Sequence, residues 1–278
     1  MKRHLDLILI FACLCVFLFF PYFKSFYNKL VPLESEGKPV VQEVMRMAQP
    51  LGPYTKHFKK KTRQVEGERK HHMVPYLWFE PARPYPENLK FPLVLVLHGA
   101  SGRMNGVQYL ITKQMRVSYP AFILAPMFSQ GSIWAAPHLT GVYQEQNLPT
   151  VVQMVKDLMQ EHPIDPKRIY VMGCSDGGTG AFGAANYYPD VFSAAVSHIG
   201  TWIPMKAPDM TKVPIWAFHG GKDEVFPYQR TKAVIDAIRQ NGGEAHFSYF
   251  EDMGHSCNGK FLYPEELWIW MFKQQKDE

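Results

Sequence analysis

The stretch Arg168–Gly178, RIYVMGCSDGG, decides the fold: a short apolar strand runs into Gly-x-Ser-x-Gly, with Ser175 at the centre. A serine hydroxyl is a poor nucleophile unless it is held at a sharp turn and given a base. Glycine at positions 173 and 177 removes the side chains that would clash in such a strand-to-helix turn. The helix that follows is predicted to begin at the serine, so its first N–H groups would face the same place.

Two further motifs lie downstream, each at the end of an apolar strand. Pro214–Gly220 (PIWAFHG) leads to Asp223, and His246–Glu251 alternates like a strand and leads to His255. Three neighbouring strand ends of one parallel sheet would bring these residues to Ser175. There His255 would take the serine proton and Asp223 would orient the imidazole. Asp223 is the preferred acid because it is the first carboxylate beyond its strand; the rival acids are residues 224 and 252.

An oxyanion-binding loop is expected upstream of these motifs. The strongest buried strand, FPLVLVL at 91–97, breaks into HGASG at 98–102. An acyl-transfer site takes one N–H from the residue after the nucleophile, here Asp176, and one from this loop. Ala100 is the preferred second donor and Ser101 the alternative. Asp176 is unusual, since its N–H would help an oxyanion while its carboxylate would oppose negative charge.

Other side chains near the predicted strand ends receive different roles. His98 and His219 each end a strand before a glycine, and we expect both to stabilise loop backbone. His198 ends a third strand, and it is a candidate for contact with substrate. The irregular stretch Pro126–Asn147 carries Trp134, a second candidate for contact with substrate. This stretch is expected either to form a pocket wall or to be an ordinary packed loop.

The whole chain alternates between strand and helix patterns, which predicts a parallel sheet. Its 278 residues suit one domain of α/β size and leave no room for a large cap domain. Helices are expected after Asn147, over 228–241 and after Pro264. The strand-like runs cover residues 71–80, 93–98, 121–126, 168–173, 194–200, 214–220 and 246–251.

These motifs resemble the dienelactone-hydrolase and polyhydroxybutyrate-depolymerase-like carboxylesterases, which are related to the catalytic domains of prolyl oligopeptidases. The resemblance rests on the His-Gly after residue 97, on 164–178, on YPDVFSAA at 188–195 and on HGGKD at 219–223. It implies an α/β-hydrolase fold, with a mostly parallel central sheet and helices on both faces. The Ser175, Asp223, His255 order is also the order of α/β-hydrolases.

The N-terminus is predicted to be a separate piece. A basic start is followed by the uncharged run Leu7–Phe20, which suits an export signal or a membrane anchor. We therefore expect a signal peptide or anchor at 1–27, a tether at 28–55 and the catalytic domain at 56–278. The basic start favours a chain whose domain lies outside the cytoplasm, secreted or membrane-anchored. A buried core helix is the alternative for the apolar run.

Composition adds few constraints on partners. The net charge is +5, and part of it comes from the basic run Lys56–Arg63. This run is expected to be a solvated edge, with contact to anionic lipid as the alternative. Nothing suggests nucleic-acid binding, a cofactor or a metal site, and no pattern specifies an oligomeric state. Cys174 and Cys257 flank two of the candidate site residues, and free thiols are favoured over a disulfide between them.

The sequence therefore predicts an exported serine hydrolase that cleaves small-molecule or polymeric carboxylic esters. Two alternatives remain. One is a serine peptidase of the prolyl-oligopeptidase type, which is disfavoured because the sequence holds no propeller-sized N-terminal domain. The other is a catalytically silent hydrolase fold used for binding, which is disfavoured because all three positions of the triad are filled.

Overall fold

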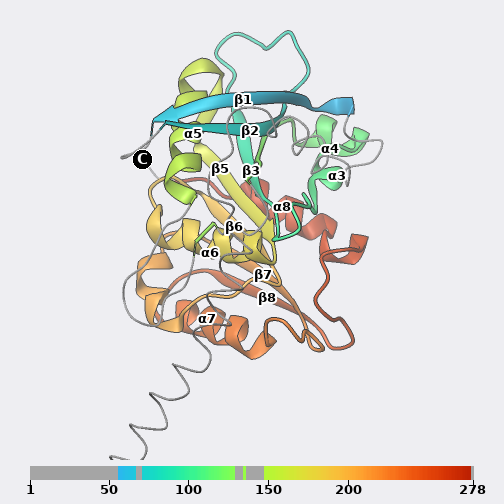
Figure 1. The fold of residues 1–278 in the computed structure, drawn as a ribbon, viewed down its shortest axis with the longest axis vertical. Coiled ribbons are helices and arrows are strands. Elements are labelled where there is room, and N and C mark those ends of the chain that lie inside the picture. The colour runs from blue at the N-terminus through green and yellow to red at the C-terminus, as the bar shows by residue number, and fades with distance from the viewer. Residues whose placement is uncertain (1–55, 67–70, 129–133, 136–146, 277–278) are drawn as a thin grey trace, which may run out of the picture. The chain divides into compact units, whose positions relative to one another are not determined.

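A computed structural model describes residues 56–66, 71–128, 134–135 and 147–276 (Figure 1). The chain divides into two units, 1–41 and 42–278, and the described residues all belong to the second. The predicted export segment and tether, and most of the predicted pocket wall, lie outside the described residues. Within the described ranges, no helix has both the length and the apolar character that crossing a membrane requires.

The described residues form an eight-stranded sheet in the order β1-β2-β4-β3-β5-β6-β7-β8. The pairs β1–β2 and β2–β4 are antiparallel, and all the other pairs are parallel. Strands β2 to β8 coincide with the seven predicted runs, which confirms a mostly parallel sheet. The strands are β1 (Lys59–Glu66), β2 (His71–Phe79), β3 (Phe91–Leu97), β4 (Phe122–Pro126), β5 (Ile164–Cys174), β6 (Ala194–His198), β7 (Ile215–Gly220) and β8 (Ala245–Phe250).

Helices cover both faces of the sheet, as the resemblance implied (Figure 1). Side chains of α5, α6, α7 and η2 pack with one face in one hydrophobic core. Side chains of α3, α4, α8 and η3 pack with the other face in a second core. The helices are α3 (Val107–Leu110), α4 (Lys113–Ser118), α5 (Leu148–Glu161), α6 (Asp176–Tyr187), α7 (Tyr228–Gln240) and α8 (Glu265–Lys273), with 3₁₀ turns η2 (Pro204–Met210) and η3 (Lys260–Leu262).

Strand β3 shows why the sheet is buried on both sides. Its side chains alternate between the two cores, so Leu93, Leu95 and Leu97 join one while Val94 and Val96 join the other. A strand with apolar residues on both faces is typical of a parallel sheet covered by helices. Such a strand cannot shift along its neighbours without losing its packing, and this fixes where its carboxyl end lies.

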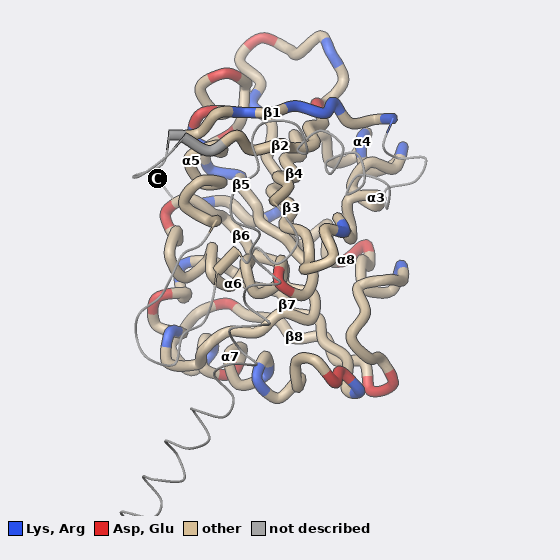
Figure 2. Tube along the Cα trace, viewed as in Figure 1, with Lys and Arg blue, Asp and Glu red and all other residues tan. Residues whose placement is uncertain are grey.

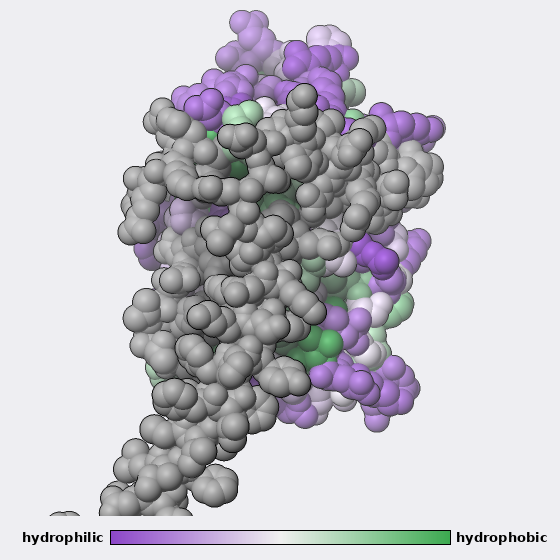
Figure 3. Space-filling model, in the orientation of Figure 1, coloured by the Kyte–Doolittle hydropathy of each residue, from purple (hydrophilic) through white to green (hydrophobic). Residues whose placement is uncertain are grey.

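Strand β1 was not predicted, because its lysines read as a charged run. It forms the edge of the sheet beside β2, and Figure 2 shows Lys and Arg positions, in blue, along this strand. Arg63 bonds Glu161 at 2.6 Å, and Lys59 bonds Glu80 at 3.0 Å. Lysine on an edge strand discourages pairing with a second chain. In Figure 3, hydrophilic side chains gather at the end of the molecule where β1 lies.

Candidate active site

The turn after β5 holds Ser175 in a conformation that few residues other than glycine adopt. Its backbone φ is 57° and ψ is −116°, and it caps the N-terminus of α6. Such an outlier is costly and marks a constrained, functional turn. A Cβ placed on Gly177 would lie 2.0 Å from the Leu97 carbonyl oxygen, and one on Gly173 would lie 2.3 Å from the Gly177 carbonyl carbon. Both glycines are therefore required, as the motif predicted.

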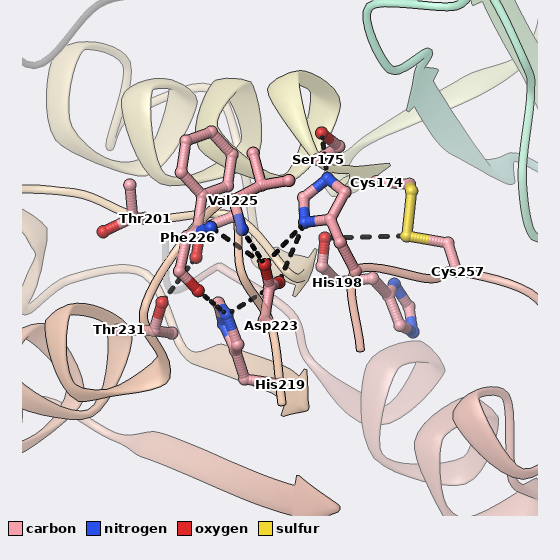
Figure 4. Close-up of polar contacts among 12 residues, drawn as sticks. Cys174, Ser175, His198, Thr201, His219, Asp223, Val225, Phe226, Thr231 and Cys257 are labelled. Atoms are coloured by element: carbon pink, nitrogen blue, oxygen red, sulfur yellow. Dashed lines mark hydrogen bonds and ion pairs between the residues drawn. A yellow bond between two sulfur atoms is a disulfide. The ribbon is translucent and has the colours of Figure 1, made fainter. Parts of the chain in front are cut away.

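The structure brings together the three residues predicted to form a triad (Figure 4). The Ser175 Oγ lies 2.9 Å from Nε2 of His255. On the other side of the ring, Nδ1 of His255 lies 2.8 Å from Oδ2 and 3.0 Å from Oδ1 of Asp223. These residues follow β5, β8 and β7, so the carboxyl ends of three strands supply them.

The carboxylate of Asp223 is buried and saturated with donors. Its side chain has no solvent-accessible surface. Oδ1 accepts the backbone N–H groups of Val225 at 2.9 Å and Phe226 at 2.8 Å, and Oδ2 lies 3.2 Å from Nε2 of His219. A buried charge needs such partners. The donors fix the carboxylate against His255 and leave it able only to accept a hydrogen bond from the imidazole.

The two rival acids lie elsewhere. Glu224 is exposed to solvent, and the structure gives its carboxyl no hydrogen bond to a described residue. The side chain of Asp252 is 86% exposed and forms an ion pair with Lys222 at 2.6 Å. The structure thus brings Asp223, and neither rival, against His255.

His219 supports the acid from behind. Its Nε2 lies 2.8 Å from the Phe226 carbonyl oxygen, as well as near Asp223. Burial lowers the pKa of His219, against the opposing effects of that carbonyl and of Asp223. A neutral ring with its proton on Nε2 donates that proton to the Phe226 carbonyl, beside the Asp223 carboxylate. The prediction that this histidine holds loop backbone is confirmed, but its contact with the acid was not foreseen.

His98 organises the loop that faces the elbow. Its Nε2 accepts the N–H of Phe128 at 3.1 Å, so its Nδ1 carries the proton that reaches the Gly99 carbonyl at 2.8 Å. Burial lowers the pKa of His98, which keeps the ring neutral in this role. The expected backbone role is confirmed.

The two predicted oxyanion donors belong to segments that border the serine. A Cβ on Gly99 would be 3.5 Å from the Ser175 Cβ, so the loop that carries Ala100 approaches the elbow closely. Asp176 is the first residue of α6, where backbone N–H groups have no acceptor within the helix. The assignment of these two N–H groups to an oxyanion hole stays a prediction.

The carboxyl group of Asp176 lies half-buried beside the nucleophile. Burial raises its pKa, and the neighbouring His255 opposes that rise. No described residue donates a hydrogen bond to this carboxylate. Burial therefore disfavours its charged form, and the group that favours that form is His255.

The side chains predicted to touch substrate are interior instead. His198 is wholly buried; its Nε2 donates to the Leu262 carbonyl at 2.8 Å, and burial lowers its pKa to about 4. Trp134 is 1% exposed, and its indole N–H donates to the His98 carbonyl at 2.7 Å. A substrate contact needs exposed surface, which neither has. We correct both assignments to structural support of the strand ends.

A disulfide joins Cys174 to Cys257, which corrects the expectation of free thiols (Figure 4). Cys174 directly precedes the candidate nucleophile, and Cys257 lies two residues beyond the candidate base. The sequence shows that both cysteines flank site residues, but it does not show how close they are in space. Their Cα atoms are 6.1 Å apart, which is within disulfide range.

Comparison with known proteins places this geometry in a family. The family model of the dienelactone hydrolases matches residues 79–261, more than half of the chain. A probable carboxylesterase SOBER1-like of Arabidopsis thaliana is 26% identical over 113 residues, 38% of this chain and 43% of that protein. The bifunctional acetylxylan esterase/xylanase XynS20E of Neocallimastix patriciarum is 26% identical over 158 residues, 55% of this chain and 23% of that protein. The chain thus spans less than half the length of these curated relatives.

Solved structures agree on the fold. A thermostable esterase superposes with a TM-score of 0.71 at 25% identity, covering 80% of this chain and 64% of that one. The acylaminoacyl peptidase of Pyrococcus horikoshii has a TM-score of 0.60 at 15% identity, covering 80% of this chain and 43% of that one, which shows a shared fold alone. With the elbow, the strand order and the family match in agreement, this chain belongs to the dienelactone hydrolase family, with an α/β-hydrolase fold.

Proposed function

We propose that this protein is an exported serine hydrolase that cleaves carboxylic esters through an acyl-enzyme on Ser175. The observation that carries the proposal is the continuous hydrogen-bonded chain from the Ser175 Oγ through His255 to Asp223, with links of 2.9 Å and 2.8 Å. The carboxylesterase and esterase relatives support ester chemistry.

The tautomer of His255 follows from its partners. A carboxylate can only accept hydrogen bonds, so Asp223 holds the imidazole proton on Nδ1. The Nε2 lone pair then faces the serine hydroxyl. As the Ser175 Oγ attacks the ester carbonyl, its proton passes to Nε2, and Asp223 stabilises the imidazolium that forms. Proton transfer of this kind contributes about 10²–10⁴-fold in rate.

The same histidine completes both halves of the reaction. It returns the proton to the leaving alcohol as the tetrahedral intermediate collapses to the acyl-enzyme. It then takes a proton from the water that attacks the acyl carbonyl, and it gives that proton to the Ser175 Oγ as the acyl–oxygen bond breaks. The ring of Phe226, whose centroid is 5.5 Å from that of His255, packs edge-on against the imidazole and helps to hold it for both steps.

The negative charge of each tetrahedral intermediate needs donors in place before it forms. The backbone N–H groups of Ala100 and Asp176 are proposed to supply them, with the N-terminus of α6 adding its dipole. Gly99 supports this, because a Cβ there would lie 3.1 Å from the Cys174 carbonyl oxygen, a tight contact, so the first loop passes close to the elbow.

Export is proposed from two features. The apolar run at 7–20 after a basic start suits a signal or anchor. The disulfide between Cys174 and Cys257 supports an oxidising compartment, because the reducing cytoplasm keeps thiols from pairing.

A substrate panel tests the proposed activity. The oxidised protein and a Ser175→Ala variant are assayed on p-nitrophenyl esters and on peptide amides. We expect ester hydrolysis that is lost in the variant. Undiminished hydrolysis in Ser175→Ala contradicts the assignment, faster turnover of amides than of esters favours the peptidase alternative, and no turnover by the wild type favours a silent binding fold.

A further inference from the structure

We propose that the disulfide between Cys174 and Cys257 is a positioning device that holds His255 against Ser175, so that full hydrolase activity requires the oxidised protein. The inference rests on the proposed function, because it concerns the rate at that site. One covalent bridge joins the segment of the nucleophile to the segment of the base, across 83 residues of sequence.

The two ends of the bridge differ in how firmly the fold holds them. Cys174 is the last residue of β5, in the interior of the sheet and paired with β6. Cys257 lies in the connection between β8 and η3. Within the described residues, no backbone N–H from 254 to 257 donates to a backbone carbonyl. The bridge therefore ties an irregular segment to a strand of the rigid sheet.

His255 itself has few other supports. Its ring contacts Asp223, Ser175 and the edge of Phe226, and all three contacts depend on where the segment places the ring. Beyond it, the nearest anchors are the bridge, the hydroxyl of Tyr263, which donates to the Cys257 carbonyl at 3.2 Å, and the side chain of Asn258, which accepts from Asn105 at 3.1 Å. Without the bridge, these two neutral hydrogen bonds would hold the far side of the segment.

The bridge is also packed. Both cysteines are buried, and with Ile199 they form a small apolar cluster that Met253 covers. Ile199 has a backbone φ of 47°, and it follows His198, whose carbonyl accepts the N–H of Ser175 at 2.9 Å. The bridge thus reaches the base segment, the elbow and the end of β6 at one point.

The bridge forms and breaks by thiol–disulfide exchange. The two thiols become one disulfide by transferring two electrons and two protons to a disulfide oxidant, such as oxidised glutathione, which leaves as two thiols. A dithiol such as dithiothreitol reverses the reaction. A catalytic group displaced by about 1 Å lowers the rate on the order of 10²-fold. Reduction of the bridge should therefore lower kcat.

The test compares the full-length oxidised wild type with a Cys174→Ala/Cys257→Ala variant. We expect kcat on a p-nitrophenyl ester to fall by about 10–10²-fold with KM unchanged, and fluorophosphonate labelling to slow by the same factor. Reduction of the wild type should produce the same loss, and oxidised glutathione should reverse it. The double variant should respond to neither reagent.

Controls separate positioning from stability. Val155→Ala removes buried volume from α5, in a hydrophobic cluster separate from that of the bridge, and should lower Tm while leaving kcat unchanged at a temperature below its unfolding. If the double variant does not fold, reduced wild type with alkylated thiols replaces it. A bridge-free protein with wild-type kcat overturns the inference, whereas an oxidised wild type without esterase activity overturns the proposed function instead.

Discussion

The Asp223 carboxylate accepts hydrogen bonds from the backbone N–H groups of Val225 and Phe226 and from His255, and these fix its orientation. His219 lies beside it, with Nε2 3.2 Å from Oδ2. Asparagine at this position would offer an N–H where an acceptor is needed, and it would turn the imidazole to the wrong tautomer.

We therefore expect Asp223→Asn to lower kcat for an ester by about 10⁴-fold, with a smaller change in KM. Steady-state kinetics on a p-nitrophenyl ester measure this. Asp252→Asn is the matched control, because the Asp252 side chain is 86% exposed and should leave kcat unchanged. If Asp252→Asn is crippling and Asp223→Asn is mild, the acid has been assigned to the wrong residue.

For single residues, the sequence predicted which side chains follow the strands, but it did not predict which of them are buried. Ser175, Asp223 and His255 were predictable because each follows an apolar strand of a parallel sheet. His198 also follows such a strand, yet it is wholly buried. The difference lies in the turn that follows the strand. Gly200, after β6, packs against Gly178, so that a Cβ on Gly200 would lie 2.2 Å from the Gly178 carbonyl carbon. That close approach buries the end of β6, and no local pattern shows it.

At the scale of elements, the contact between β3 and α6 sets the elbow. Gly177 lies against the Leu97 carbonyl, which is backbone and cannot move aside. Gly177→Ala should therefore destabilise the fold by more than the roughly 1–3 kcal/mol of ordinary overpacking.

Thermal unfolding of the purified Gly177→Ala protein measures this loss of stability. Gly254→Ala is the control, since its nearest neighbour would be 3.5 Å away and its Tm should stay near wild type. An unchanged Tm in Gly177→Ala would contradict the close packing described for the elbow.

A second element-scale prediction concerns the attachment of β1. Burial alone would raise the pKa of Glu80, but hydrogen bonds from Lys59, Trp78 and Arg83 outweigh it and lower the pKa to about 2. The folded-state pKa is thus below the unfolded value of about 4.3. The stabilisation is present above the unfolded pKa and is lost as pH falls toward 2.

Glu80→Gln should then lower stability by about 1 kcal/mol at pH 7, or roughly 2–4 °C in Tm, since two of the three donors are exposed. The difference from wild type should shrink between about pH 5 and pH 2. Thermal unfolding across that range provides the measurement. A difference that persists unchanged at the acid end would mean that the carboxylate charge is not responsible.

Strands β2 to β8 and the long helices were predictable, whereas β1 and the short helices were not. A short apolar run such as β3 predicts a buried strand in an α/β chain, and the apolar residues of α5 recur with a helical period. Strand β1 lacks the apolar alternation of a strand, because long basic side chains cover part of the neighbouring surface. The Lys61 Nζ, for example, lies 5.8 Å from the centroid of the Trp78 ring. The helices α3 and α4 span four and six residues, too few for a helical period to be read.

For the whole molecule, the sheet and both helical layers are complete within the described residues. We therefore expect a truncated protein that begins at Lys56 to be soluble and to hydrolyse esters at the full-length rate per molecule. The rate is compared after both proteins are purified in oxidised form. A truncated protein that unfolds would show that the preceding residues belong to the core.

The full-length chain should be found in the membrane or exported fraction of its native host. Fractionation followed by detection of the chain tests this. Soluble full-length protein in the cytoplasm would contradict the proposed export and would leave the disulfide without the compartment that favours it.

Labelling with a fluorophosphonate tests the central claim most directly, because the probe bonds covalently to an activated serine. Mass spectrometry of the digested adduct locates the bond. We expect it on the peptide that carries Ser175, with no labelling of a Ser175→Ala variant that is otherwise folded. An adduct on another serine, or undiminished labelling of that variant, would contradict the assignment of Ser175 as the nucleophile.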